Sequence, residues 1–190
     1  MNILKTEKSN LTIYSFENKD LINLCIQDIQ DKLIVNPSII VYGKNCIQHR
    51  SIGFFSDESV GYFYSGKLAK SQKLTPNLKK LLIQVSYMFN TKFNGILVNK
   101  YDSGLDYIGK HSDDESNLSN VGVVSISYGA SRKFRIRDKK TNKKILDVIT
   151  KSHELLHMGG DFQKEFTHEI PIEKKFKDSR ISFTFRYHKK

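Results

Sequence analysis

The sequence predicts an α+β protein in which two N-terminal helices pack against a double-sheet jelly roll. The first observation is a pair of segments before residue 94 whose apolar residues recur at helical spacing. The second is a change at about residue 94 to short runs of strand-forming residues separated by turns. Helices followed by many short strands are typical of a helical layer on an antiparallel sandwich. We expect one domain over residues 1–190, with an N-terminal extension of helices and hairpins over 1–93 and a jelly-roll core over 94–190.

Both predicted helices have recognisable N-termini. The first covers residues 19–33, with Asn18 available as its N-cap. The second covers residues 76–90 and starts with Pro76 directly after Thr75, a favourable pair for the first turn. The apolar positions that define the two stripes are Leu21, Leu24, Cys25, Ile29 and Leu33 in the first helix and Leu78, Leu81, Leu82, Val85, Met88 and Phe89 in the second.

Short runs after residue 93 are predicted as strands. Each is rich in β-branched and aromatic residues and is bounded by Gly, Asn, Asp or Lys turns. Their order favours a double-stranded β-helix, the cupin-like form of the jelly roll. The runs are NGILVNKY (94–101), GVVSISY (122–128), KFRIRD (133–138), KILDVIT (144–150), ELLHM (154–158), EFTHEI (165–170) and RISFTFRY (180–187).

The composition indicates a basic protein with a polyanionic partner. Lys and Arg number 31 against 20 acidic residues, which gives a net charge of +11 that both halves of the chain share. Such an excess favours nucleic acid first and an anionic membrane second. No apolar run is long enough to span a bilayer, the start of the sequence lacks a secretory signal, and two cysteines make no disulfide framework. We therefore expect an intracellular, reduced protein without a membrane segment.

A possible metal site begins at the motif His111-Ser112-Asp113. Residues i and i+2 of a strand point to the same face, so the imidazole and the carboxylate would lie together. His168 in FTHEI could complete the two-His-one-carboxylate arrangement of iron(II), which leaves positions open for oxygen and a co-substrate. Taken alone, the motif fits polar surface residues beside a turn better. The other histidines are expected to fill surface or core positions: His49, His153, His157 and His188.

Three further features favour ligand or nucleic-acid binding, and each has a plainer alternative. Arg180 and Arg186 share one face of the last strand and could grip a small dicarboxylate, or they could lie on a solvent-exposed face. The basic stretch 132–144 could track phosphates or form a solvated hairpin. The turn VYGKN (41–45) could present Tyr42 as a wedge between bases, or the ring could pack back on the domain. None of the three decides the function by itself.

The order of four motifs resembles the AlkB family of iron(II)- and 2-oxoglutarate-dependent dioxygenases. The motifs are VNKYDSGLDYIGKHSDDE (98–115), SISYGASRKF (125–134), MGGDFQKEFTHEIP (158–171) and RISFTFR (180–186), and the similarity covers about residues 38–187. The family removes alkyl groups from nucleobases. The resemblance therefore implies that iron(II), 2-oxoglutarate and O₂ are used to hydroxylate an N-methyl group, with release of formaldehyde and succinate.

The resemblance also implies a role for each matching residue. The iron ligands would be His111, Asp113 and His168. The residues that bind 2-oxoglutarate would be Asn99, Tyr101, Arg180, Thr184 and Arg186. The residues that contact the nucleic acid would be Tyr42, Gly43, Lys44, Arg50, Tyr62, Phe63, Tyr64, Asp114 and Glu115.

Within the family, the N-terminal half is similar to the animal branch that acts on double-stranded DNA. VYGK resembles a hairpin whose aromatic tip fills the gap left by an extruded nucleotide, which gives that place to Tyr42. YFYSG (62–66) resembles a segment whose third residue, here Tyr64, stacks on the damaged base. The acids that would meet the flipped base are Asp114 and Glu115, and the residue expected on the opposite strand is Arg50.

The predicted function is therefore repair of 1-methyladenine and 3-methylcytosine in DNA, with duplex favoured. Such lesions pair poorly, which lowers the free energy of flipping by up to a few kcal/mol. We expect a monomer that acts in the nucleus of a eukaryote, or otherwise in the cytoplasm. Two alternatives remain at this point: the same chemistry on RNA or single strands, and a catalytically inactive nucleic-acid-binding homologue.

Overall fold

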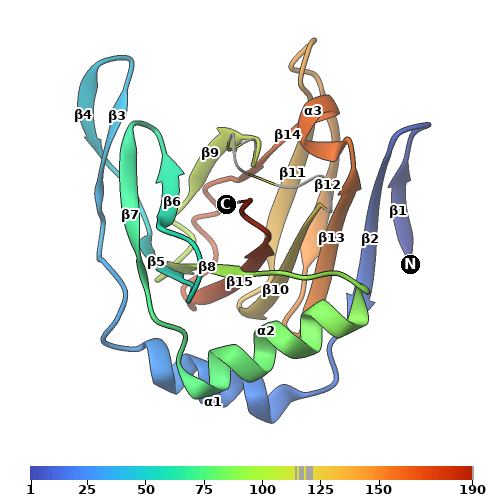
Figure 1. Ribbon diagram of the computed structural model, residues 1–190. Helices are drawn as coiled ribbons and strands as arrows, with labels where there is room; N and C mark the ends of the chain where they lie inside the picture. The colour runs from blue at the N-terminus through green and yellow to red at the C-terminus, as the bar shows by residue number, and fades with distance from the viewer. Residues whose placement is uncertain (114, 116–117, 119–121, 190) are drawn as a thin grey trace.

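The computed structural model describes residues 1–113, 115, 118 and 122–189. A nine-stranded sheet forms its centre (Figure 1). Neighbouring strands pair antiparallel except β5 and β7, which are parallel. In spatial order the strands are β1 (Asn2–Lys5), β2 (Ser9–Ser15), β13 (Glu154–Gly160), β10 (Val123–Gly129), β15 (Arg180–Arg186), β8 (Gly95–Tyr101), β5 (Ser51–Phe55), β7 (Lys67–Gln72) and β6 (Gly61–Tyr64).

A second, four-stranded antiparallel sheet faces the middle of the first. Buried residues of both sheets, among them Tyr101 and Leu156 of the large sheet and Ile136 and Phe166 of the small one, form one hydrophobic cluster. Two sheets packed face to face, antiparallel apart from the β5–β7 pair, confirm the predicted jelly roll. In spatial order the strands of the small sheet are β12 (Lys144–Thr150), β11 (Arg132–Asp138), β14 (Phe166–Ile170) and β9 (Ile108–His111).

Helices α1 and α2 cover the other face of the large sheet (Figure 1). Asn18 and Thr75 cap them as expected, because each side-chain oxygen accepts the backbone N–H three residues further on. Helix α1 ends before residue 33, although Leu33 still packs against the core. The helices are α1 (Lys19–Ile29), α2 (Pro76–Met88) and the short α3 (Phe162–Glu165).

The central strands separate apolar from polar side chains. In β15, Ile181, Phe183 and Phe185 join the cluster formed with α1 and α2. The alternating polar side chains face the small sheet, and every residue of β15 is buried. The solvent-exposed face considered from the sequence is therefore wrong. A buried polar face costs free energy unless its groups find partners, so the interior of the jelly roll is where a polar ligand would bind. The polar side chains are Arg180, Ser182, Thr184 and Arg186.

Strands from the first part of the chain extend both edges of the large sheet. Apart from the hairpin region around VYGK and YFYSG, no strand was predicted before residue 94, yet β2 pairs along β13 and β5 pairs along β8. The pairing from Ser51 opposite Lys100 to Phe55 opposite Ile96 joins the expected N-terminal extension directly to the expected core. The division at residue 93 stays a prediction about organisation. It does not mark a gap in the hydrogen-bonded sheet.

The VYGK turn is the tip of a separate two-stranded hairpin. Tyr42 and Gly43 both have positive φ values, 48° and 74°, which is the backbone of a two-residue type I′ turn. Figure 1 shows the hairpin projecting beyond the neighbouring strands β6 and β7. The Tyr42 side chain is fully exposed, so it does not pack back on the domain. The two strands are β3 (Ser38–Val41) and β4 (Lys44–Ile47).

Candidate metal and co-substrate site

Three side chains that could bind a metal meet between β9 and β14. His111 lies directly opposite His168 in the register of the two strands, and their rings are 4.3 Å apart. Asp113 follows β9 by two residues and is buried. One nitrogen or oxygen atom from each residue lies within 4.8 Å of those of the other two. The structure thus brings together the two imidazoles and the carboxylate that the sequence singled out.

Hydrogen bonds orient two of these side chains. Nδ1 of His111 lies 2.8 Å from the carbonyl of Gly109, and because a carbonyl only accepts, Nδ1 carries the proton and Nε2 keeps a free lone pair. Oδ1 of Asp113 accepts from Arg186 at 3.3 Å, whereas Oδ2 faces Nε2 of His168 at 3.7 Å. One carboxylate oxygen is therefore held from behind, and the other is directed at the imidazoles.

The protonation states also suit a metal. Burial lowers the pKa of His168 to about 3 and lowers the pKa of His111 as well. Burial alone would raise the pKa of Asp113, but the charge of Arg186 and the nearby imidazoles outweigh it and bring that pKa to about 2. Neutral imidazoles and an ionised carboxylate are the forms that ligate a divalent cation. The residues present fit iron(II).

We expect the metal-free protein to lose stability as the pH falls from 6.5 towards 3. His168 binds a proton in the unfolded chain below its ordinary pKa of 6.5 but in the folded chain only near 3. The free energy of unfolding should therefore fall by up to about 1.4 kcal/mol per pH unit within this window. Asp113 adds to this only below its ordinary value of 3.8.

Urea denaturation of the metal-free chain at about pH 7.5 and about pH 5 measures the effect. The His168→Gln variant is the control, since Gln does not titrate, and its loss of stability on acidification should be smaller. Equal losses in the two proteins would contradict the assignment to His168.

A cationic cradle lies deeper between the sheets. Arg180 is 3% exposed, and its Nη2 donates to Ser127 at 2.9 Å. Its Nε and Nη1 find no hydrogen-bond partner within the described part of the chain, although both are buried. The centroid of the Tyr101 ring lies 5.5 Å from the guanidinium carbon of Arg180. A buried cation with unsatisfied donors is costly unless an anion completes it, so this cradle fits one carboxylate of 2-oxoglutarate.

The cavity of the cradle reaches the metal ligands. Asn99 lies opposite Ser182 in the sheet, and Thr184 Oγ1 is 3.3 Å from Ser125 Oγ. The side chains that line this cavity include all of the predicted 2-oxoglutarate residues and all three predicted ligands: Asn99, Tyr101, His111, Asp113, His168, Arg180, Thr184 and Arg186.

Arg186 and Glu115 do not lie quite as the resemblance implied. The fully buried guanidinium of Arg186 binds Asp113 through Nη2 and Glu115 through Nη1. Glu115 also accepts from Nε2 of His188 at 2.7 Å. Both oxygens of Glu115 thus accept hydrogen bonds inside the protein, while the residue also lines the hollow at the mouth of the site, and its contact with a flipped base stays a prediction. His188, expected to fill a surface or core position, is buried and has this carboxylate as a partner.

An aromatic stack lies at the mouth of the site. Tyr62 is buried, and the centroid of its ring lies 4.7 Å from the guanidinium carbon of Arg186. Its ring stacks on that of Tyr64, with centroids 5.9 Å apart and planes at 13°. The edge of the Tyr64 ring meets the ring of His111, with centroids 5.9 Å apart, and Phe63 is 59% exposed. A hollow of about 420 Å³ opens here. It is lined by Tyr62, Phe63, Tyr64, Ser65, His111, Ser112 and Glu115.

Arg50 and Asp114 were both predicted to contact nucleic acid. Arg50 is 3% exposed, because its Nε donates to Asn99 at 2.9 Å and its guanidinium lies 5.2 Å from the Tyr64 ring. This buried position does not support a contact with the DNA strand opposite the lesion. Arg50 instead holds Asn99 in the wall of the co-substrate pocket. Asp114 lies outside the described residues.

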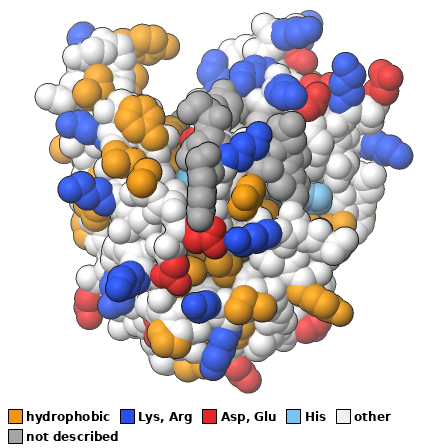
Figure 2. Space-filling model, in the orientation of Figure 1, with side chains coloured by type: hydrophobic (Ala, Val, Ile, Leu, Met, Phe, Trp, Pro, Cys, Tyr) orange, Lys and Arg blue, Asp and Glu red, His pale blue; other side chains and the backbone are white. Residues whose placement is uncertain are grey.

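The basic stretch 132–144 is only partly available to phosphates. Arg132 is buried against three backbone carbonyls, Arg135 pairs with Asp147, and Arg137 pairs with Glu169. The exposed lysines lie at the β11–β12 turn and just beyond it, and Figure 2 shows basic side chains along this rim, across the mouth from the apolar β3–β4 side. These lysines are Lys139, Lys140, Lys143 and Lys144.

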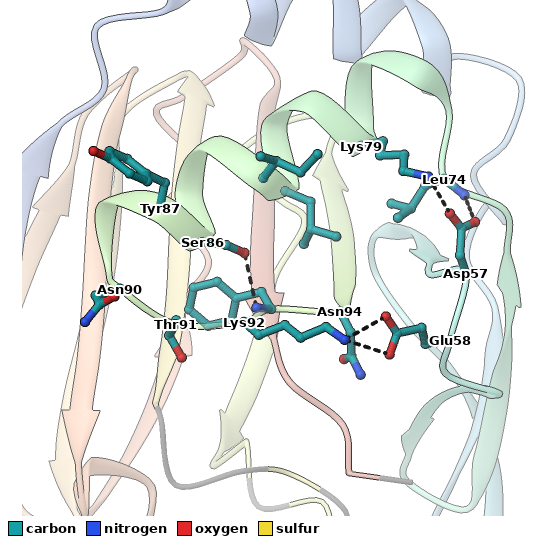
Figure 3. A pocket seen from close by; sticks show the side chains of 13 residues that line it. Asp57, Glu58, Leu74, Lys79, Ser86, Tyr87, Asn90, Thr91, Lys92 and Asn94 are labelled. Carbon is teal, nitrogen blue, oxygen red and sulfur yellow. Dashed lines mark hydrogen bonds and ion pairs between the residues drawn. The ribbon is translucent and has the colours of Figure 1, made fainter.

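A larger cavity of about 980 Å³ lies elsewhere, beside α2 (Figure 3). Leu74 and Phe93 line it, and its rim carries the ion pairs Lys79–Asp57 and Lys92–Glu58. None of the residues predicted to bind metal, co-substrate or nucleic acid lines it. Its size therefore does not make it the site of the predicted chemistry.

The fold and the site together define a class of protein. Residues 15–186 match the 2OG-Fe(II) oxygenase superfamily, and the chain belongs to that superfamily. The predicted iron(II), 2-oxoglutarate and O₂ are thereby confirmed as its cofactor and co-substrates.

Curated relatives and a solved structure narrow the comparison. The chain is 30% identical over 154 residues to the DNA oxidative demethylase ALKBH2 of Homo sapiens, with 77% of this chain and 59% of that protein covered. It is 28% identical over 188 residues to the ALKBH2 of Arabidopsis thaliana, with 84% and 60% covered. These relatives confirm the resemblance to the AlkB family, and the chain spans less than two thirds of their length.

The solved structure of OsALKBH1 has the same fold. It superposes with a TM-score of 0.64 at 17% identity and covers 96% of this chain and 100% of its own. No helix in the described residues is long and apolar enough to cross a membrane.

Proposed function

We propose that the protein is a DNA oxidative demethylase that removes N-methyl groups such as those of 1-methyladenine and 3-methylcytosine. The observation that carries the proposal is the hollow at the Tyr62–Tyr64 stack, which leads from the surface to His111. A flat aromatic wall beside a metal ligand suits a nucleobase taken out of its helix. The similarity to proteins named DNA oxidative demethylases supports DNA as the substrate.

In this proposal each side chain has a defined task. His111, Asp113 and His168 hold iron(II), and Arg180 pairs with the far carboxylate of 2-oxoglutarate, beside Asn99 and Tyr101. When bound, iron(II) and 2-oxoglutarate would activate O₂, which would supply the oxidising equivalents both for conversion of 2-oxoglutarate to succinate and for hydroxylation of the methyl group.

The surroundings of the metal protect that chemistry. Arg186 keeps the rear oxygen of Asp113 occupied and so leaves Oδ2 for the metal. Tyr64 forms the wall against which the base lies. The apolar rings of Phe134, stacked on His168 at 4.9 Å, and of Phe162 exclude water from that side of the site.

The hairpin tip supplies the part of the proposal that concerns duplex DNA. Tyr42 is an exposed aromatic ring on a rigid two-residue turn, with Gly43 and Lys44 after it. An inserted ring can fill the space of an extruded base and so offset part of the free energy of unstacking. The exposed lysines of the β11–β12 turn add sequence-independent attraction to phosphates. We infer that a monomer acts on DNA in the nucleus of a eukaryote or otherwise in the cytoplasm.

The direct test uses the purified protein with iron(II), ascorbate and 2-oxoglutarate. An oligonucleotide with one 1-methyladenine is offered as duplex and as single strand, and mass spectrometry follows the loss of one methylene unit. Loss from the duplex at a rate close to that from the single strand supports repair of duplex DNA. Loss from the single strand alone moves the substrate to RNA or single strands, and no loss with several lesions favours an inactive binding protein.

Tyr42→Ala should lower demethylation of duplex DNA about tenfold or more and leave the single-strand rate unchanged, because removal of a stacked aromatic ring costs about 1–3 kcal/mol. The paired rates of the variant and the parent on both substrates measure this. Ile47→Ala is the matched control, since Ile47 is a 64% exposed apolar residue of the same hairpin away from the tip. An equal loss of demethylation rate on duplex and single-stranded DNA would contradict the proposal that Tyr42 inserts into the duplex.

A further inference from the structure

A buried histidine outside the three predicted ligands is connected to the metal centre. His188 lies two residues after β15 and is 2% exposed. Its Nε2 is 2.7 Å from Oε2 of Glu115, and its Nδ1 is 2.8 Å from the hydroxyl of Ser59. A carboxylate only accepts hydrogen bonds, so Nε2 carries a proton and, in the neutral ring, Nδ1 accepts from Ser59.

The position of His188 is fixed on every side. Its backbone N–H donates to the side chain of Asn94 at 2.8 Å, and its carbonyl accepts from the same amide at 2.8 Å. Its ring stacks on Phe54, with centroids 5.4 Å apart and planes at 15°. Asn94 stands between this site and the cavity beside α2, where Figure 3 labels it. The imidazole is thus a rigid donor aimed at Glu115.

Glu115 passes this constraint on to Arg186. Arg186 is fully buried and divides its two terminal nitrogens between Glu115 and Asp113. If Glu115 turned away, the guanidinium would be left with Asp113 as its one carboxylate partner among the described residues. It would then be free to swing across both oxygens of Asp113, including Oδ2, which faces His168. The outer carboxylate therefore keeps the arginine on Oδ1.

We propose that His188 is a positioning residue of the metal centre. It holds Glu115 so that Arg186 stays on the rear oxygen of Asp113 and leaves the other oxygen to the iron. Outer hydrogen-bond partners that orient metal ligands typically change metal affinity 10- to 100-fold when removed. This inference rests on the proposed ligand roles of His111, Asp113 and His168, and it does not depend on DNA as the substrate.

The test measures iron(II) affinity without nucleic acid. Anaerobic titration of iron(II) into the full chain with 2-oxoglutarate, followed by visible charge-transfer absorbance, gives the Kd. His188→Leu, which keeps bulk but no donor, should raise the Kd about tenfold. His188→Gln, whose amide nitrogen can donate to Glu115, should raise it much less. Because DNA is absent, failure of the DNA assay would count against the proposed substrate alone.

Two further variants separate positioning from general stability. His153→Asn is the matched control: the ring of His153 packs edge-on against Tyr128 and lines neither the cavity of the metal site nor the hollow at its mouth, and Asn accepts its φ of 64°. It should lower the melting temperature without changing the Kd. Glu115→Gln should weaken iron(II) binding as His188→Leu does, and the double variant should show less than the sum of the two effects.

The outcomes are distinct. An unchanged Kd in folded His188→Leu overturns the proposal, as does a His188→Gln variant that binds iron(II) as weakly as His188→Leu. If His188→Leu does not fold, the cycle formed by His188→Ala, which also removes the donor, and Glu115→Gln decides. Non-additive changes in Kd support the connection between the two residues, and additive changes refute it.

Discussion

Asp113→Asn is expected to abolish iron(II) binding and demethylation together. We expect the Kd for iron(II) to rise by more than the roughly 100-fold that changes in outer hydrogen-bond partners cause, because this carboxylate is a proposed ligand itself. The amide keeps the size of the side chain but removes the negative charge, and charge is what a two-His-one-carboxylate site contributes to a divalent ion. Metal titration and turnover of 2-oxoglutarate measure the two effects.

The size of this effect follows from burial. The carboxylate of Asp113 is 5% exposed, and its pKa of about 2 shows that the ionised form is strongly favoured. In the variant, Arg186 keeps only Glu115 as a charged partner among the described residues. The neutral amide therefore weakens the metal site and unbalances the arginine behind it.

The matched control is Asp147→Asn. Asp147 pairs bidentately with Arg135 at 2.8 and 2.9 Å, but the pair is partly exposed on the small sheet and does not line the site. Exposed pairs contribute up to about 1 kcal/mol, so this variant should bind iron(II) as the parent does. Retention of activity in Asp113→Asn would remove the basis of the proposed metal centre.

Arg180→Lys is expected to raise the KM for 2-oxoglutarate by roughly 30-fold or more, since loss of a buried hydrogen-bonded charge pair costs about 2–5 kcal/mol. The side chain of Arg180 is buried with two unsatisfied nitrogens, the arrangement that a bidentate carboxylate would complete. Lysine keeps the charge but not the planar fork. Succinate formation against 2-oxoglutarate concentration gives KM and kcat separately.

Arg137→Lys provides the comparison for Arg180→Lys. Arg137 bridges to Glu169 on the partly exposed face of the small sheet, outside the cavity that Arg180 lines. Its replacement should leave the KM unchanged. If Arg180→Lys changes kcat at an unaltered KM, the residue does not bind the co-substrate and the cradle has another role.

The sequence was sufficient for what periodicity and local spacing determine. The two helices, their caps at Asn18 and Thr75, and the alternation along β15 all follow from nearest-neighbour rules. His111 and His168 were paired correctly as residues that meet, since the motif and its order along the chain specified both. In each of these cases the relevant neighbours are few residues away or belong to a recognisable motif.

The features that the sequence did not predict depend on contacts between distant segments of the chain. His188 stands 73 residues from Glu115, and nothing near it in the sequence marks it as the partner of a buried acid. Arg50 was placed among the nucleic-acid contacts, but it directly precedes β5, which pairs with β8, and its side chain turns inward to Asn99 of β8. Strands β2 and β5 were missed because their neighbours in the sheet, β13 and β8, decide that they pair.

Strand β15 comes after every other strand in the sequence, yet it lies in the middle of the nine-stranded sheet, between β10 and β8. Both of these strands leave an edge unpaired until β15 inserts, so we expect folding to be slow and governed by non-local pairing. The same strand carries Arg180 and Arg186. During synthesis on the ribosome, a chain that has not yet released this strand lacks both the co-substrate cradle and the support of Asp113. The co-substrate cradle and the support of Asp113 are therefore complete only when the central strand of the sheet is in place.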